Sequence, residues 1–488
     1  MSRKTPTIVC SPFRNSTTAA RADSGRAGER TGAPRAPHPV GAQSARAETG
    51  SGRSFVLLAA ILSLVPLSAH AVRGVVVDAA TCRPVAGAFV TMGDTVVRTG
   101  PDGGFRINGS GTALGLRAYG YGRRRIPLAR FRDGATLDLA TFRPKALYLS
   151  FYGIGDARLR QGALTLAKEA GINALVIDVK GERGMISYKT TIPLALAIGA
   201  QKITTIANVQ QLVNDLHGAG LYVIARIVVF QDNVLALAKP ELAVHDADGA
   251  VWKDREGLAW IDPFETRAWD YDIDIAVDAA REGFDEIQFD YVRFPDARGL
   301  TFSRPDTQEN RVAAITDFLA AARKRLAPYN VFLAADIFGY TIWNPDDTGI
   351  GQDLPALVRV VDYVSPMLYP SGFQYGIPGY ANPVLHPYEI VSQSLRKAVE
   401  RTAIAPIRFR PWLQAFRDYA FGGRPFGGPE IAAQIGAARA FGSDGWMLWN
   451  PENVYSGAGL PPQSGATVSA SQARGNDPAA AGSHRCAP

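Results

Sequence analysis

Short apolar runs separated by turn residues make up the chain between residues 72 and 142. The runs are 72–78, 85–92, 96–99, 105–107, 114–119 and 137–139. Glycine and proline lie between several of them, as in the sequence Gly-Pro-Asp-Gly-Gly at 100–104. Short strands at this spacing are typical of an all-β sandwich. We therefore predict a small N-terminal β-sandwich domain over residues 72–142.

The period of the pattern changes at Lys145, where apolar runs begin to alternate with amphipathic helical stretches. The strand-like runs are 146–151, 174–179, 222–230, 286–291, 331–338, 363–368, 407–413 and 445–448. The helical stretches are 158–170, 203–218, 267–281, 307–327, 354–360, 387–402 and 429–441. Strands that alternate with helices indicate βαβ units and a parallel sheet.

Eight β/α units within residues 145–455 predict an α/β fold whose main domain is a (β/α)8 TIM barrel. A doubly wound open sheet is the alternative, and it normally carries a glycine-rich phosphate-binding turn after its first strand. The corresponding segment, 151–158, lacks the third glycine of that turn. The barrel is therefore the favoured interpretation.

An uncharged apolar stretch at 54–69 is followed closely by an Ala-x-Ala sequence. It is shorter than the roughly 20 residues of a spanning helix and has the form of a signal peptide. We predict a signal peptide over 54–71 and an exported protein, periplasmic or secreted, with no membrane span once mature; an uncleaved anchor is the alternative. Residues 1–53 are predicted to be a disordered extension or the product of a misplaced start codon, and 456–488 a disordered tail.

Composition and charge exclude several classes of protein. With 47% hydrophobic and 20% charged residues in 488, the chain is neither wholly disordered nor fibrous. Residues 1–53 hold nine basic and three acidic residues, so they account for six of the seven formal positive charges. The rest of the chain therefore gives no electrostatic argument for a nucleic-acid partner. The three cysteines (Cys10, Cys82 and Cys486) are widely separated, and no His motif typical of a metal site occurs, so we expect no metal or other cofactor.

Two acidic residues lie at the ends of neighbouring predicted strands. Asp290 lies near the end of the fourth apolar run, and Asp336 near the end of the fifth. If Phe289 packs outward against the helices, the alternation of a strand directs Asp290 toward the barrel axis. Active sites of TIM barrels lie at the carboxyl ends of their strands. A pair of carboxylates at this end is the arrangement that glycoside hydrolysis uses, so both are candidate catalytic residues.

Further polar and aromatic residues lie at the same strand ends and are candidates for substrate binding, because sugars stack on aromatic rings and bond to amides and carboxylates. They are Asp178, Arg226, Arg293, Tyr369, Trp412, Gln414, Trp449 and Asn450. The catalytic and binding candidates also have structural alternatives. Asp178 could pair with Lys180, Asp290 could pair with Arg293, Asp336 could cap a turn, and the tryptophans could belong to the core.

Residues 74–107 carry the strings G-V-V-V-D, T-C-R-P-V-A-G-A-F-V and T-G-P-D-G-G-F-R-I. In these strings the region resembles the carboxypeptidase regulatory-like (transthyretin-like) domain. The resemblance implies an accessory module, near carbohydrate, that has no catalytic residues of its own.

The barrel region carries the motifs A-L-Y-L-S-F-Y-G, N-A-L-V-I-D-V-K-G-E-R-G, F-D-Y-V-R-F-P-D, D-Y-V-S-P-M-L-Y-P-S-G-F, R-P-W-L-Q-A-F and G-W-M-L-W-N-P-E-N-V-Y. With them it resembles a bacterial family of putative glycosyl hydrolase domains placed among the TIM-barrel glycosidases. By similarity to retaining glycosidases of the α-amylase and α-galactosidase clans, the resemblance implies Asp290 as nucleophile and Asp336 as acid/base. The α-amylase pattern has Glu at the latter position.

The sequence thus predicts a glycoside hydrolase that acts on a carbohydrate outside the cytoplasm. Asp290 is expected to stay ionised beside Arg226 and Arg293, and Asp336 to stay protonated among apolar neighbours. The alternative is an exported polysaccharide-binding protein that uses the same barrel without turnover. Two arginines bound to one of the two acids would favour this alternative.

Overall fold

The computed structural model describes residues 71–462. The predicted leader, the predicted signal peptide up to residue 70 and the tail from residue 463 lie outside the described residues. The described residues belong to one compact unit. None of the helices within 71–462 combines the length and the apolar character needed to cross a bilayer.

The N-terminal part forms two β-sheets. Its strands are β1 (Ala71–Asp78), β2 (Phe89–Met92), β3 (Thr95–Arg98), β4 (Gly104–Asn108), β5 (Ala113–Arg117), β6 (Arg124–Pro127) and β7 (Ala135–Leu139). One sheet has the order β4-β1-β7 and the other β3-β2-β5-β6. Side chains such as Val76, Val90 and Leu116 from the two sheets share one buried core. The sequence pattern missed β6, because two arginines at its start conceal its half-buried face.

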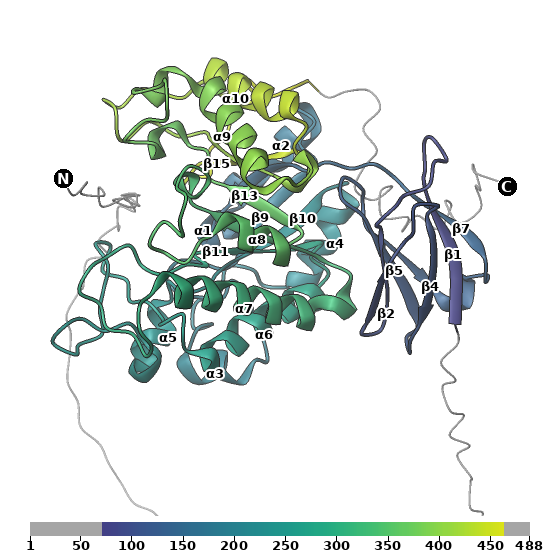
Figure 1. The fold of residues 1–488 in the computed structure, drawn as a ribbon, viewed down its shortest axis with the longest axis horizontal. Helices are drawn as coiled ribbons and strands as arrows, with labels where there is room; N and C mark the ends of the chain where they lie inside the picture. The colour runs from purple at the N-terminus through teal and green to yellow at the C-terminus, as the bar shows by residue number, and fades with distance from the viewer. Residues whose placement is uncertain (1–70, 463–488) are drawn as a thin grey trace, which may run out of the picture. The chain divides into compact units, whose positions relative to one another are not determined.

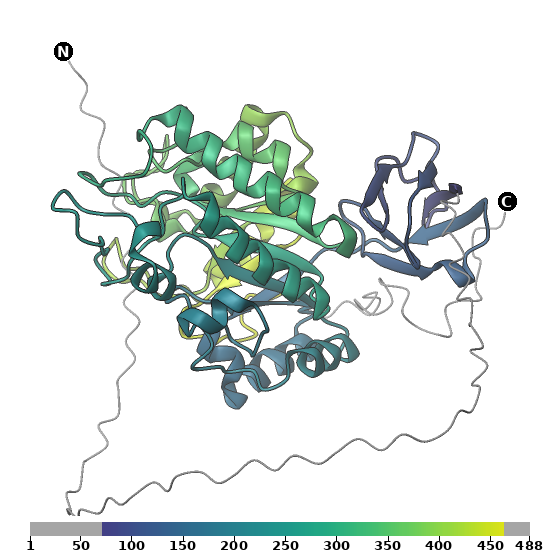
Figure 2. The same cartoon turned by 90° about the horizontal axis from the view of Figure 1, so that it is seen from below.

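Eight parallel strands form the second part (Figures 1 and 2). They are β8 (Lys145–Leu149), β9 (Ala174–Lys180), β10 (Tyr222–Val228), β11 (Glu286–Asp290), β12 (Phe332–Ile337), β13 (Tyr363–Pro366), β14 (Trp412–Gln414) and β15 (Trp446–Trp449). Their order is β13-β12-β11-β10-β9-β8-β15-β14. Parallel bridges from Val364 to Phe409 and from Met367 to Trp412 join the two ends of this order. The sheet therefore closes, and the predicted (β/α)8 barrel is confirmed.

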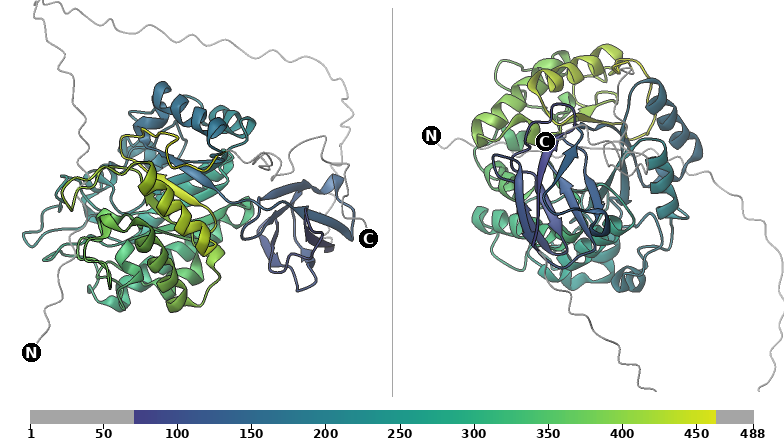
Figure 3. Two further views of the ribbon diagram at one scale, coloured as in Figure 1. Left: turned by 90° about the horizontal axis from the view of Figure 1, so that it is seen from above. Right: turned by 90° about the vertical axis from the view of Figure 1, so that its right-hand side faces the viewer.

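Helices surround the strands (Figure 3). They are α1 (Phe151–Gly155), α2 (Ala157–Glu169), α3 (Pro193–Ile198), α4 (Val209–Gly218), α5 (Asn233–Ala238), α6 (Thr266–Arg281), α7 (Gln308–Leu326), α8 (Leu354–Val360), α9 (Pro387–Thr402) and α10 (Gly428–Phe441). The helix predicted from residue 203 begins only at Val209, because Asn208 caps it. The seventh strand begins at Trp412, because Pro406–Arg408 forms a 3-10 turn.

The alternation of the strands divides the barrel core into two layers. Outward side chains pack against the helices, as Phe289 does on Phe318 of α7, with their ring centroids 5.0 Å apart. Inward side chains such as Ile224, Ala334 and Met447 fill the barrel interior. Because Phe289 faces outward, Gln288 and Asp290 on either side of it face inward. This alternation positions the acids described next.

Candidate active site

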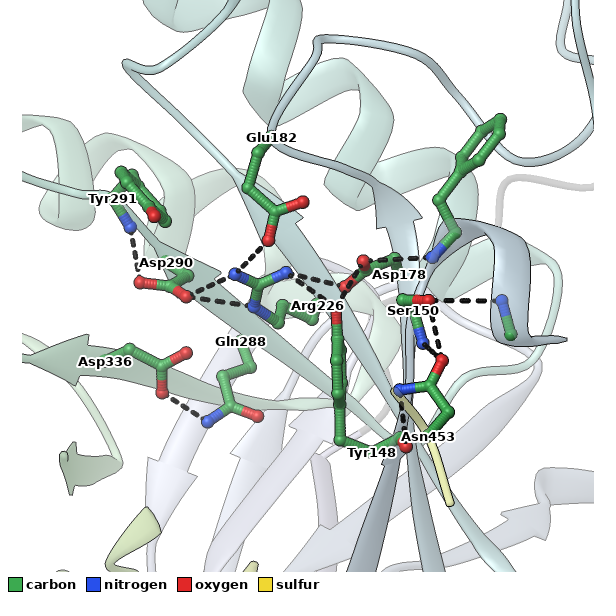
Figure 4. Close-up of polar contacts among 12 residues, drawn as sticks. Tyr148, Ser150, Asp178, Glu182, Arg226, Gln288, Asp290, Tyr291, Asp336 and Asn453 are labelled. Carbon is green, nitrogen blue, oxygen red and sulfur yellow. Dashed lines mark hydrogen bonds and ion pairs between the residues drawn. The ribbon is translucent and has the colours of Figure 1, made fainter. Parts of the chain in front are cut away.

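Asp290 and Asp336 lie side by side at the carboxyl end of the barrel (Figure 4). Phe289 pairs with Ala335 in the parallel register of β11 and β12, so the two acids are the next neighbours along these strands. Only 5% of Asp290 and 1% of Asp336 are exposed. The structure therefore brings the two predicted catalytic carboxylates together in a buried, inward-facing pair.

Arg226 on β10 holds Asp290. Its Nε–H and Nη2–H groups donate to Oδ2 of Asp290 at 2.9 and 2.6 Å. The backbone N–H of Tyr291 donates to the other carboxylate oxygen at 2.6 Å. Tyr291 has φ of 50°, a left-handed conformation that is uncommon for a bulky residue. Both carboxylate oxygens of Asp290 therefore accept hydrogen bonds, and Oδ2 is paired with a guanidinium.

Asp336 lies in a different environment. Its Oδ1 accepts hydrogen bonds from Gln288 and from the indole N–H of Trp412, while its Oδ2 is buried without a hydrogen-bond partner. Burial and the negative charge of Asp290 raise the pKa of Asp336 well above its ordinary value. Since a buried carboxylate oxygen without a donor is costly, the protonated acid is the form that this site favours.

Arg226 also binds two more carboxylates, and Figure 4 shows it between Asp290 and Asp178 with Glu182 nearby. Its Nη1–H donates to Asp178 at 2.7 Å, and its Nη2–H donates to Glu182 at 3.1 Å. A longer contact of 3.5 Å reaches the hydroxyl of Tyr148. All five N–H donors of the guanidinium therefore have acceptors within the protein, so Arg226 orients the acids rather than offering a free donor.

Asp178 is enclosed on all sides. The Tyr148 hydroxyl and the Phe151 N–H donate to its Oδ2 at 2.7 and 3.1 Å, and the residue has no exposed surface. Burial raises the pKa of Asp178 to about 7, and the charge of Glu182 adds to this, while Arg226 opposes it. The alternative pairing of Asp178 with Lys180 is wrong, because Lys180 binds Asp232 and Asp272 at 2.7 and 2.6 Å.

Three of the predicted aromatic residues gather around these acids. Trp449 stacks on Tyr148 with a centroid separation of 3.9 Å and lies edge-on to Trp412 at 5.4 Å. The guanidinium of Arg226 lies 4.9 Å from the centre of the Trp449 ring. Asp336 and Asp290 add to the effect of burial in raising the pKa of Tyr369, as nearby negative charges do. Tyr369, Trp412 and Trp449 are thus brought together with the carboxylates.

The other predicted binding residues are engaged elsewhere. Arg293 has no hydrogen bond or ion pair with Asp290; it donates to the Phe294 carbonyl and lies 4.8 Å from the Trp260 ring centre. Its expected place beside Asp290 is wrong, because the left-handed turn at Tyr291 ends the strand alternation.

The two predicted amide side chains, those of Gln414 and Asn450, form hydrogen bonds with strand-end loops. The Gln414 Nε2 donates to Ser371 and to the Phe416 carbonyl, and its Oε1 accepts the Ser371 N–H. Asn450 donates to the carbonyls of Ala415 and Val454, so both side chains hold strand-end loops in place.

Glu182 is one of the site residues that the sequence analysis missed, together with Tyr148 and Gln288. It lies in a tight turn after β9, closed by a hydrogen bond from the Gly184 N–H to the Gly181 carbonyl. Its side chain is 28% exposed, against 7% for Asp290 and none for Asp178. The sequence did carry a signal for Glu182: it is an acidic residue between two glycines, directly after a barrel strand, where active-site residues of TIM barrels lie. Within residues 71–462, no three His, Cys, Asp or Glu side chains are grouped so that they could hold a metal ion.

Comparison with known proteins identifies the family. The family described as "Putative glycosyl hydrolase domain" matches residues 146–455. This range contains the barrel and the site residues described above. The chain belongs to this family. No curated protein matches this chain.

Several solved structures resemble the protein. A hypothetical protein from Ruminiclostridium thermocellum is 39% identical over 39% of this chain and 96% of its own, with a TM-score of 0.35. The PgaB (BpsB) glycoside hydrolase domain from Bordetella bronchiseptica is 17% identical over 66% of this chain and 99% of its own, with a TM-score of 0.48. A chitinase from Chromobacterium violaceum is 14% identical over 67% of this chain and 98% of its own, with a TM-score of 0.38.

The charge of Glu182 in this glycosyl hydrolase domain predicts a measurable effect on Asp178. Its replacement by Gln removes a charge that raises the pKa of Asp178, so that pKa falls below about 7. An acid with a raised folded-state pKa stabilises the fold below its unfolded pKa and loses this contribution as pH rises through the folded value. We therefore expect a smaller loss of unfolding free energy between about pH 4 and pH 7 in Glu182→Gln than in the wild type.

Urea unfolding at several pH values measures this difference. Glu309→Gln, an exposed Glu on α7, is the matched control and is expected to follow the wild type. A Glu182→Gln curve that is parallel to the wild-type curve would contradict the predicted coupling.

Proposed function

We propose that this protein hydrolyses O-glycosidic bonds of a polysaccharide or oligosaccharide outside the cytoplasm, with Asp290 and Asp336 as its two catalytic carboxylates. One observation carries the proposal: two inward carboxyl groups on adjacent strand ends lie in different environments, Asp290 paired with a guanidinium and Asp336 buried with a raised pKa and one oxygen that has no hydrogen-bond partner. Such a split between neighbouring acids is how glycosidases assign the ionised and the protonated role.

The roles follow from the hydrogen bonds. Asp290, held in place by Arg226 and the Tyr291 N–H, attacks the anomeric carbon with a carboxylate oxygen as the bond to the leaving oxygen breaks. Asp336 transfers its proton to that oxygen, and its carboxylate then takes a proton from the water that releases the sugar from Asp290. Arg226 remains bound to Asp178 throughout and fixes the position of Asp290.

The surroundings of the acids also support catalysis over binding alone. Only one arginine, Arg226, donates to Asp290, and the donors to Asp336 are an amide and an indole. Neither acid is therefore held by two arginines. Trp449, which is partly exposed, lies beside the acids, and aromatic rings pack on the apolar faces of sugars, which makes carbohydrate the proposed substrate class.

Export remains part of the proposal and is supported by the sequence of residues 54–71. N-terminal sequencing of the mature protein is expected to begin at Val72, and a chain that begins at Met1 would contradict export by cleavage.

A screen for released reducing ends tests the proposed activity. Purified protein is incubated with bacterial exopolysaccharides and with α-glucans, alongside Asp290→Asn as the inactive control. We expect release from at least one polymer by the wild type and none by the variant. Binding to a polymer without any release would favour the polysaccharide-binding alternative.

The raised pKa of Asp336 predicts the pH profile of that activity. A general acid must be protonated, so kcat/KM is expected to hold well above the ordinary carboxyl range and to fall as pH rises through the raised pKa of Asp336. Asp336→Asn should remove this alkaline limb together with most of the activity, by about 10²–10⁴-fold. Initial rates across the pH range measure both effects. An unchanged alkaline limb in Asp336→Asn would show that another group donates the proton.

A further inference from the structure

A cavity of about 270 Å³ lies away from the catalytic acids, between the sheet that contains β2, β3 and β5 and the segments α7, β12 and β13. Its apolar lining includes Phe89, Leu326 and Leu333. Its charged lining consists of Arg98, Arg117, Arg323 and Asp362. Three guanidinium groups therefore face one carboxylate across a space that is large enough for a small organic molecule.

Arg117, at the end of β5, is the unusual member of this lining. Only 5% of the residue is exposed, and its Nε–H is buried without a hydrogen-bond partner. Its Nη1–H groups donate to neutral oxygens alone, those of Thr91 at 3.3 Å and Asn330 at 3.2 Å. A buried guanidinium without a carboxylate partner is costly, and an anion beside it would remove most of that cost.

Asp362 is the one acidic residue in the lining of this cavity, and its carboxylate already has hydrogen-bond donors within the protein. Asp362 accepts hydrogen bonds from Arg323 at 2.9 Å and from the Leu333 N–H at 3.0 Å. Within the described residues its ion pair is with Arg323, and it forms none with Arg98 or Arg117. Burial lowers the pKa of Arg117; the negative charge of Asp362 opposes this shift, and the positive charge of Arg323 adds to it.

The ring of Phe89 holds these cations close together. The guanidinium carbons of Arg98 and Arg117 lie 4.3 and 4.5 Å from its centre, and that of Arg323 lies 5.8 Å away. Cation–π contacts offset part of the repulsion among them. They provide no hydrogen-bond acceptor, however, so the unpaired N–H of Arg117 still has none.

We propose that this cavity is a binding site for a small oxyanion, a carboxylate or phosphate group, held by Arg117 and Arg98. The Nε–H of Arg117 donates to the anion, and Arg98 closes the exposed side of the site. An organic body attached to the anionic group contacts Phe89 and Leu326. The site is separate from the proposed hydrolase chemistry and does not depend on it.

Isothermal titration calorimetry of the full chain tests the site, with inorganic phosphate and glucuronate as separate probes at constant ionic strength. We expect one saturable site per chain for at least one probe. Tighter binding of glucuronate than of phosphate would indicate that the organic body contributes. Arg117→Met is expected to weaken binding about tenfold or more, since charge-assisted hydrogen bonds are strong. Arg106→Met, an exposed arginine on β4, is the matched control and should bind like the wild type.

A second variant keeps the test decisive if Arg117→Met does not fold. Arg98→Glu changes an exposed residue at the rim and should also weaken binding at least about tenfold by repelling the anion. The proposal fails if the wild type binds neither probe saturably. It also fails if a folded Arg117→Met or Arg98→Glu binds as tightly as Arg106→Met.

Discussion

Asp290→Asn is expected to lower kcat/KM by about 10³-fold or more on any polymer that the wild type hydrolyses, because the amide cannot act as the nucleophile. The fold should survive the change. Arg226 keeps two carboxylate partners, Asp178 and Glu182, so no buried cation is left alone. Reducing-end release and circular dichroism of the same samples measure the two effects separately.

The matched control for this substitution is Asp317→Asn, which changes an exposed aspartate on α7 and should keep wild-type activity. Wild-type turnover by a folded Asp290→Asn would remove Asp290 from the mechanism. Loss of activity in both variants would point to a general effect of the substitution on stability rather than on chemistry.

Arg226→Met is expected to lower the free energy of unfolding by about 3–5 kcal/mol near neutral pH. The side chain is fully buried and ion-paired with Asp178, Asp290 and Glu182. Without it, buried carboxylates remain with no cation, and their folded-state pKa values rise. The folded state then binds protons more tightly than the unfolded state, so the deficit should shrink as the pH is lowered.

Urea unfolding of Arg226→Met at neutral and mildly acidic pH measures this deficit. Arg396→Met, an exposed arginine on α9, is the control and should change the unfolding free energy by less than about 0.5 kcal/mol. A deficit that is the same at both pH values would show that lost packing, not unpaired charge, destabilises the variant.

The barrel and its central pair of acids were predictable because they depend on local alternation. Apolar runs identified every barrel strand, and the outward position of Phe289 was enough to direct Asp290 inward. The neighbouring strand repeats the same pattern, which places Asp336 beside Asp290. A periodic pattern carries this information without any long-range contact.

The partners of the acids were less predictable, because they depend on irregular backbone. The register of β9 and β10 shifts after Arg226, so Lys180 leaves the barrel interior and binds Asp272 on α6. The left-handed turn at Tyr291 likewise separates Arg293 from Asp290. Neither irregularity has a distinct signature in a single sequence. Glu182 was missed for the related reason that a loop, not a strand, positions it.

The saturated guanidinium of Arg226 has a consequence for how a ligand can enter. A sugar oxygen gains a hydrogen bond from it only by taking the place of an existing acceptor. Glu182 makes the longest of its carboxylate contacts, at 3.1 Å, and is the most solvent-exposed of them. Exchange at this one acceptor would leave Asp178 and Asp290 undisturbed, so the floor of the site stays rigid while its rim adapts to the incoming chain.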